Sequence, residues 1–249
     1  GELGNQNTSS LYPFFETMPL TIGKGKWLLD GALTNTAGIP ALVSTLLTWE
    51  RVRSFNIGLD FGMFSNRLTG SIEYFKRKTL DMVGPAPQLP AVLGIAVPKT
   101  NNADMQSVGF DFDIQWRDRI GKVDYGIKFN LSDAQAKVLR YPNTTDAIGD
   151  WYAGKLSGTY WGYVTKGIAK TDEEMQEHLA SLPNGGQNKI GSKWGAGDIM
   201  YVDVNGDGQI SPGQNTLSDH GDKTIIGNST PRFNYGIILD AAYAGFDFS

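Results

Sequence analysis

The fold is decided by one alternating stretch, Phe55-Asn56-Ile57-Gly58-Leu59-Asp60-Phe61-Gly62-Met63. Successive side chains of a β-strand point to opposite faces, so this stretch predicts a strand with one apolar face and one small, polar face. A turn at Ser65-Asn66 and a second alternating run from Leu68 to Tyr74 follow it, which predicts a hairpin over about 50–79. The apolar face of this hairpin meets either a protein core or lipid.

The same alternation recurs along the chain, at about 105–117, 123–132 and 232–243, and a further strand starts at Phe246. Short turns join the strands within each pair, whereas long segments at 80–104 and 138–230 separate the pairs. Strands therefore lie near 50–79, 105–132 and 232–249, and the sequence predicts an all-β, antiparallel up-and-down meander.

The segment 138–230, called the excursion below, is too long to lack structure within one fold. Thr171 followed by Glu174 three residues later forms a capping-box pattern, and Met175, Leu179 and Leu182 recur at helical spacing before Pro183. The excursion is therefore expected to hold one short helix.

Composition narrows the classes of protein. The chain has 249 residues, a formal net charge of −4 and no cysteine. Mild acidity argues against a nucleic-acid partner, and the lack of cysteine excludes disulfides and thiolate metal sites. No signal peptide and no apolar run of about 18 residues occur, but the short, half-apolar strands of a membrane β-barrel would not produce such a run.

Two architectures share this strand pattern. Short turns on one side and long loops on the other, with strands of about ten residues, are typical of an outer-membrane β-barrel. A soluble β-sandwich alternates in the same way, with its apolar face turned into a core. In a barrel segment Phe55, Ile57, Phe110, Phe112, Ile127 and Phe129 are expected to be exposed, and in a sandwich they are expected to be buried.

Ordered motifs along the chain make the barrel more specific. They include Leu47-Thr48-Trp49-Glu50, Asn66-Arg67-Leu68-Thr69-Gly70-Ser71-Ile72-Glu73-Tyr74, Asn102-Ala103-Asp104-Met105, Gly109-Phe110-Asp111, Asp203-Val204-Asn205-Gly206-Asp207-Gly208 and Ile226-Gly227-Asn228-Ser229-Thr230-Pro231-Arg232-Phe233. In this order and over nearly the whole chain, they resemble the SusC/RagA family of TonB-linked outer-membrane transporters. The family's chains are several times longer and carry a plug, a TonB box and a barrel of roughly 22 strands. The chain resembles a slice of the C-terminal part of that barrel, so residues 1–249 are expected to be a fragment.

The resemblance implies a function and a location. It implies import of glycans or peptides across the bacterial outer membrane, with energy from the TonB complex through regions absent here and with a SusD-like lipoprotein over the extracellular mouth. The segments 80–104 and 138–230 would then be extracellular loops, the apolar strand faces would meet membrane lipid, and the chain would not be an enzyme. The alternative is a soluble, calcium-stabilised β-sandwich that binds carbohydrate. A hydrolase would need a convergent pair of carboxylates, which the spacing does not indicate.

One motif carries metal chemistry. Asp203, Asn205, Asp207, Gln209 and Ser211 occupy alternate positions of an EF-hand-like loop, in which Gly208 allows the sharp turn. These residues predict a structural calcium site, with Gln209 contributing its backbone carbonyl. The twelfth position, where a bidentate Glu belongs, is Gln214, and Asp219 or Asp222 could replace it. The alternative is a metal-free turn, because Asn, Asp and Gly favour turns.

The remaining candidates are weaker. His178 and His220 are scattered, and the sequence favours solvated side chains over catalytic ones. The aromatic residues of the excursion are expected either to form its own small core or to stack on sugars or a partner; they are Trp151, Tyr152, Tyr160, Trp161 and Tyr163.

Overall fold

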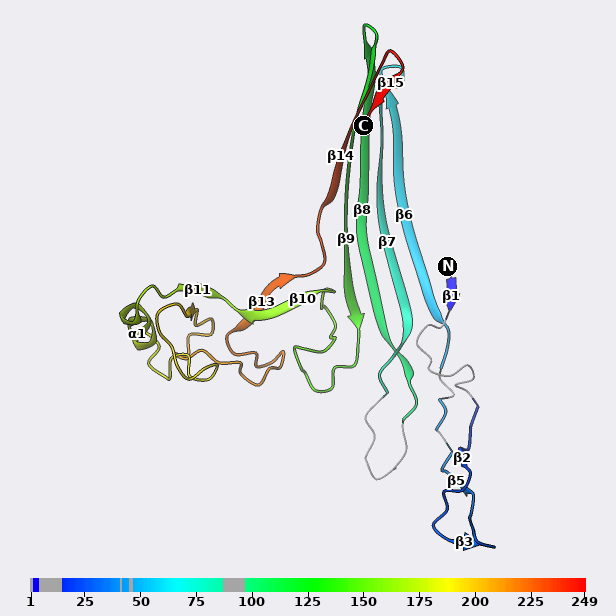
Figure 1. The fold of residues 1–249 in the computed structure, drawn as a ribbon, viewed down its shortest axis with the longest axis vertical. Helices are drawn as coiled ribbons and strands as arrows, with labels where there is room; N and C mark the ends of the chain where they lie inside the picture. The colour runs from blue at the N-terminus through cyan, green and yellow to red at the C-terminus, as the bar shows by residue number, and fades with distance from the viewer. Residues whose placement is uncertain (1, 5–14, 41, 45–46, 87–96) are drawn as a thin grey trace. The chain divides into compact units, whose positions relative to one another are not determined.

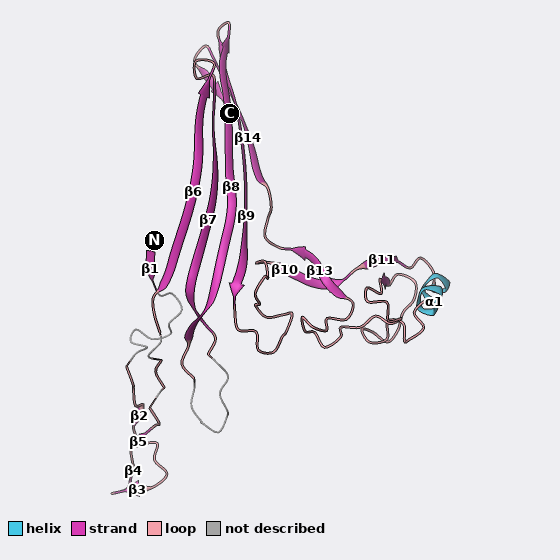
Figure 2. Ribbon diagram, turned by 180° about the vertical axis from the view of Figure 1, so that it is seen from behind, coloured by secondary structure: helices cyan, strands magenta, loops and turns pink. Residues whose placement is uncertain are grey.

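A computed structural model describes the whole chain except residues 1, 5–14, 41, 45–46 and 87–96. Its largest element is a seven-stranded sheet with the order β1-β6-β7-β8-β9-β14-β15 (Figures 1 and 2). The strands are β1 (Glu2–Gly4), β6 (Glu50–Met63), β7 (Leu68–Gly84), β8 (Thr100–Ile120), β9 (Val123–Arg140), β14 (Asn234–Tyr243) and β15 (Phe246–Phe248). From β6 onward the spatial order follows the chain order, which confirms the up-and-down meander and the all-β fold.

In the part of the chain that the structure describes, four two-stranded sheets accompany the large one. They pair β2 (Leu20–Thr21) with β5 (Thr36–Ala37), β3 (Leu28–Leu29) with β4 (Ala32–Leu33), β10 (Thr159–Tyr163) with β13 (Lys223–Asn228), and β11 (Thr165–Ile168) with β12 (Ile199–Tyr201). Among the described residues, no helix is both long and apolar enough to cross a membrane.

The chain divides into two compact units. One unit comprises Gly1–Ser54, Arg77–Met105 and Arg140–Pro142, and the other comprises Phe55–Lys76, Gln106–Leu139 and Asn143–Ser249.

Register in the second unit gathers the apolar residues on one face. Ile237 lies opposite Phe129, and Leu239 lies opposite Ile127, so that four apolar side chains from β9 and β14 share a face. The other face pairs Gly126 with Asp240 and Gly236 with Asn130. A Cβ added at either glycine would lie about 2.5 Å from the facing polar side chain, so glycine makes room for the larger partner.

Exposure of the apolar face favours the barrel over the sandwich. Phe55 is 58% exposed, Ile57 is 60% exposed and Ile127 is 46% exposed. Phe110, Phe112 and Phe129 are half-buried, and the Phe112 and Phe129 rings contact each other with centroids 6.3 Å apart. None of the six residues expected in a sandwich core is buried.

The strands extend further than the apolar alternation predicts, because polar side chains continue the contacts between strands. In the first unit, β7 reaches Gly84 and β8 starts at Thr100, so parts of the predicted loop 80–104 are strand. Here Arg51 pairs with Asp81, and Arg140 pairs with Asp104 at 2.8 Å. Likewise β9 continues to Arg140, so the first three residues of the predicted excursion are strand.

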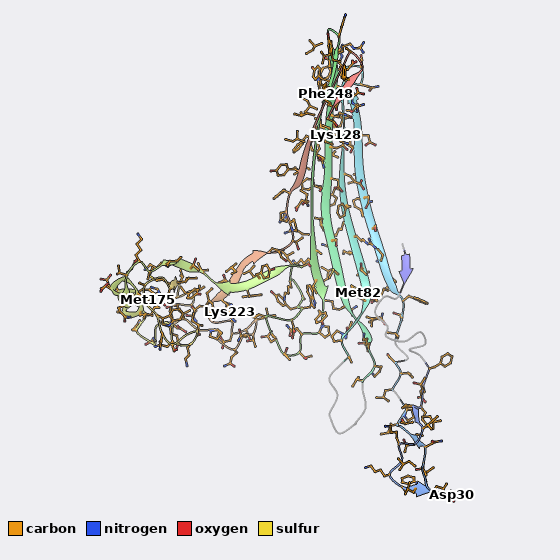
Figure 3. All side chains as sticks on the ribbon, in the orientation of Figure 1. Asp30, Met82, Lys128, Met175, Lys223 and Phe248 are labelled. Carbon is orange, nitrogen blue, oxygen red and sulfur yellow. The ribbon has the colours of Figure 1, made fainter. Side chains whose placement is uncertain are left out.

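The small buried core lies in the excursion. Ala169, Met175 and Met200 are buried together, and Leu179 and Trp194 pack against them. Figure 3 shows Met175 among the crowded side chains of this region. Aliphatic and sulfur-containing side chains therefore form the centre of this core, and none of the five aromatic residues proposed as one alternative for it belongs to this cluster.

The predicted helix is α1 (Asp172–Ala180), which starts as the capping pattern indicates. The Glu174 backbone N–H donates to Thr171 Oγ1 at 3.2 Å. The Glu174 carboxylate accepts from the N–H of Lys170 at 2.7 Å, whereas a standard capping box would use the N–H of Thr171. The first bond satisfies an N–H group that the start of the helix would otherwise leave unpaired, and the second fixes the residue before the N-cap.

Candidate functional site

The loop 203–211 folds around its own acidic side chains. The Asp203 carboxylate accepts from the N–H groups of Gly206 at 2.7 Å and Gly208 at 2.8 Å. The Asn205 side chain donates to Asp207 Oδ2 at 3.1 Å and accepts from the Asp207 N–H at 3.0 Å. Gly208 has φ +80°, the left-handed conformation that the motif predicts for this position.

Asp222 brings a third carboxylate to this loop, from 19 positions beyond Asp203. It is fully buried and accepts from the N–H groups of Val204 at 2.9 Å and Ser211 at 2.7 Å. One oxygen each from Asp203, Asp207 and Asp222 lies within 4.8 Å of the others. Three oxygen donors at such separations fit a hard cation such as Ca²⁺.

The other predicted ligands have contacts or positions different from those that the motif predicts. The Ser211 hydroxyl accepts from the Gly213 N–H at 3.4 Å, and Ser211 contacts Asp222 through its backbone. Gln209 donates its N–H to Asp207 at 3.0 Å. Gln214, at the twelfth position of the motif, is exposed. Of the two possible replacements for the twelfth ligand, the structure brings Asp222 to the cluster.

The three carboxylates of the cluster, those of Asp203, Asp207 and Asp222, are not paired with any cationic side chain among the described residues. Their recorded hydrogen bonds come from backbone N–H groups and the neutral amide of Asn205. Closely placed like charges repel each other, so a bound cation would relieve this repulsion.

Contacts with the segment after α1 hold the loop in place. The Asn184 N–H donates to Gly208 O at 2.9 Å, and its side-chain amide donates to Asp207 O at 2.5 Å. Ile210 is fully buried and donates its N–H to Gly186 O at 2.7 Å. The residues that end the helix therefore also support the acidic loop.

The prediction of two solvated histidines is wrong for His178. Its ring is buried, and Nε2 lies 3.2 Å from Gln187 Oε1. That oxygen also accepts from the Tyr201 N–H at 2.7 Å, so His178 Nε2 is the donor. His178 faces the core because it is three residues after Met175, on the same side of the helix. His220 is half-buried and its ring packs on Trp161, with centroids 5.4 Å apart.

Lys155 organises two of the predicted aromatic residues. Its Nζ donates to the carbonyls of Ile148, Gly149 and Asp150 at 3.2, 3.1 and 2.7 Å. The same ammonium lies 5.5 Å from the Trp151 ring centroid and 5.3 Å from that of Tyr152. Partial burial lowers the pKa of this amine, and the Asp150 carboxylate acts in the opposite direction.

Replacing Lys155 with Met should loosen the segment 148–152, because three N–H···O bonds and the cation–π contacts are lost together. We expect local opening to become easier by about 1–3 kcal/mol. Hydrogen exchange of the Ile148 amide, which donates to Asn215 O at 3.0 Å, measures this. Lys166→Met at an exposed position of β11 is the control, and an equal effect there would contradict the assignment.

Comparisons with known proteins agree with this fold. The family model described as "TonB dependent receptor-like, beta-barrel" matches residues 6–243. TonB-dependent receptor P3 of Formosa agariphila is 27% identical over 82% of this chain and 20% of its own length. TonB-dependent receptor SusC of Bacteroides thetaiotaomicron is 24% identical over 84% of this chain and 20% of its own. The chain thus spans about a fifth of the length of these relatives.

A solved structure of the RagAB peptide transporter has the same fold. Its TM-score is 0.56 at 18% identity, over 93% of this chain and 23% of that one. The relatives carry the names of receptors rather than enzymes, as expected for this chain. The resemblance to SusC and RagA is thereby confirmed, and so is the outer membrane as location. The chain belongs to the TonB-dependent receptor-like β-barrel family.

Proposed function

We propose that the chain is part of a receptor that imports glycans or peptides across the outer membrane, driven by TonB and assisted by a SusD-like lipoprotein. The observation that supports this most is the sequential sheet whose apolar face is exposed, within a chain that the family model covers almost completely. A barrel with a polar interior provides a path for hydrophilic solutes. The soluble sandwich is disfavoured because its core residues would have to be buried.

The proposal places the segments 80–104 and 138–230 outside the cell. Single cysteines test this, because residues 1–249 contain none, and the receptor without an added cysteine serves as the blank. In a full-length receptor, a cysteine at exposed Glu173 of α1 should react with a membrane-impermeant maleimide in intact cells. A cysteine at Lys122, in the short turn between β8 and β9, should react only after the outer membrane is permeabilised. The reverse pattern would reject this orientation.

Substrate class and partner need a separate experiment. Cells that express the full-length receptor together with the proposed SusD-like lipoprotein would be given fluorescent oligosaccharides and fluorescent peptides in parallel. Uptake of one class that stops when the TonB box is deleted would support the proposal, and co-purification of the lipoprotein in detergent would support the partner. Uptake that is unaffected by that deletion would overturn TonB-driven import.

We also propose that the acidic cluster of Asp203, Asp207 and Asp222 holds one Ca²⁺ in a structural role. What favours this is the convergence of three carboxylate oxygens in a loop with an EF-hand-like pattern. Asn205, the backbone carbonyl of Gln209 and Ser211 remain candidate ligands. Water would complete the coordination in place of the missing bidentate Glu.

Adding calcium should stabilise the excursion, since a ligand that binds only the folded state lowers its free energy. At a tenfold excess over Kd the gain is about 1.4 kcal/mol. Hydrogen exchange of the Gly206 and Gly208 amides in the full-length receptor, with calcium or with chelator, measures it. Asp203→Asn should abolish the difference and Asp219→Asn should preserve it. Identical exchange in calcium and in chelator would reject the site.

A further inference from the structure

Two segments far apart in sequence are fastened together at the base of the excursion. The Ser157 carbonyl accepts from the Asn228 side-chain amide at 2.8 Å and from the Thr230 hydroxyl at 3.1 Å. The Gly158 carbonyl accepts from the Ser229 N–H at 2.8 Å and its hydroxyl at 3.3 Å. We call residues 157–158 and 228–230 the neck; its two parts are 71–73 positions apart in these contacts.

The neck leaves no room for a side chain at Gly158. Its φ is +79°, and an added Cβ would lie 2.6 Å from both Asn228 Oδ1 and Thr230 Oγ1 and 2.8 Å from Ser229 Oγ. Asn228 is fixed from its other side as well, because Oδ1 accepts from the Thr230 N–H at 2.7 Å. By contrast, Gly154 has φ +99° with open space around its Cβ position. A side chain would therefore have to adopt a positive φ at either position, but it would meet a steric conflict only at Gly158.

Further contacts join the neck to strand β9. The Ser157 N–H donates to Ala136 O at 2.8 Å. Arg232, two residues after the neck, binds both carboxylate oxygens of Asp133 at 2.5 and 2.6 Å, and Asp133 is buried. A bidentate arginine–carboxylate pair fixes orientation as well as distance. The excursion is therefore held to β9 from both of its ends.

We propose that the neck is a rigid mount, in which Gly158, Asn228 and Thr230 are positioning residues that hold the excursion in place for substrate uptake. This rests on the proposed import function. The side chains of Asn228 and Thr230 both bind the Ser157 carbonyl of the opposite segment. We therefore expect any movement of the excursion during uptake to occur between the two parts of the neck in sequence, in residues 159–227, and to leave the contacts of the neck unchanged.

Hydrogen exchange in the full-length receptor tests the mount without any need for transport. Gly158→Ala should raise the exchange of the Ser157 and Ser229 amides by about tenfold or more, since several hydrogen bonds are lost together. Gly154→Ala should leave both amides within about twofold of wild type. The Ser211 amide, bound to Asp222, reports whether the acidic loop stays folded in either variant. Unchanged neck exchange in Gly158→Ala, or an equal rise in Gly154→Ala, would overturn the mount.

Uptake kinetics then test positioning. Thr230→Val removes the hydroxyl at nearly constant volume, and Thr230→Ser keeps it. Thr230→Val and Gly158→Ala should raise the substrate concentration for half-maximal uptake at an unchanged amount of receptor in the membrane, and Thr230→Ser should restore the wild-type value. Normal uptake kinetics with a loosened neck would overturn the positioning role. A wild-type receptor that imports neither substrate class would overturn the proposed function, while a tight neck in the exchange experiment would still support the mount.

Discussion

Replacing Asp222 with Ala is expected to destabilise the excursion by about 3–5 kcal/mol. The carboxylate is fully buried, and its loss leaves the N–H groups of Val204 and Ser211 without their acceptor. A donor left unpaired costs up to about 1–3 kcal/mol when it is fully buried, these two are part-buried, and the volume vacated by the buried carboxylate adds to the cost. Hydrogen exchange of the Val204 and Ser211 amides in the full-length receptor measures the opening free energy.

Asp219→Ala is the matched control, because Asp219 lies three positions earlier in an exposed part of the same segment. Its effect should be below about 0.5 kcal/mol. Repeating both variants with calcium and with chelator separates the two roles of Asp222. The cost that persists in chelator is the net effect of the lost N–H bonds, the vacated volume and the relieved carboxylate repulsion, and the extra cost in calcium belongs to the ion. Equal destabilisation by the two variants would contradict the role assigned to Asp222.

Leu239→Arg should impair insertion of the receptor far more than Ile238→Arg. Leu239 shares the apolar face with Ile127 and is 60% exposed, whereas Ile238 lies opposite Lys128 on the other face and is 52% exposed. Arginine on the lipid face costs about 2–4 kcal/mol near the middle of the membrane, and on the lumen side it meets water. Repulsion by Lys128 in the control adds about 1 kcal/mol at most. Heat-modifiable gel mobility in outer-membrane fractions measures the folded share, and equal losses for both variants would contradict the assignment of faces.

Period-two alternation predicted the strands well, because an exposed apolar face needs only apolar residues at every second position. It could not predict where the strands end. β7 and β8 continue through residues such as Asp81 and Asp104, whose side chains bind arginines of neighbouring strands. Such contacts depend on which strands are adjacent, which a pattern within one strand does not encode.

In the acidic loop, too, the contacts between residues close in sequence could be predicted, and the long-range contact could not. Asp203, Asn205 and Asp207 follow a local motif, and their mutual contacts arise within a few residues. Asp222 reaches the loop through a return of the chain that no spacing rule describes. The burial of His178 is predictable from the sequence, because this residue follows Met175 by three positions in the predicted helix.

The two kinds of apolar surface in this chain place different demands on evolution. Where Leu239 and Ile127 face outward, any side chain that lipid accepts will serve, so mutations can exchange Leu, Ile, Val and Phe freely. Met175 is enclosed by neighbours of fixed shape, so a change of even one methylene is felt there. Homologous receptors should therefore drift quickly at the first kind of position while keeping its character, and slowly at the second.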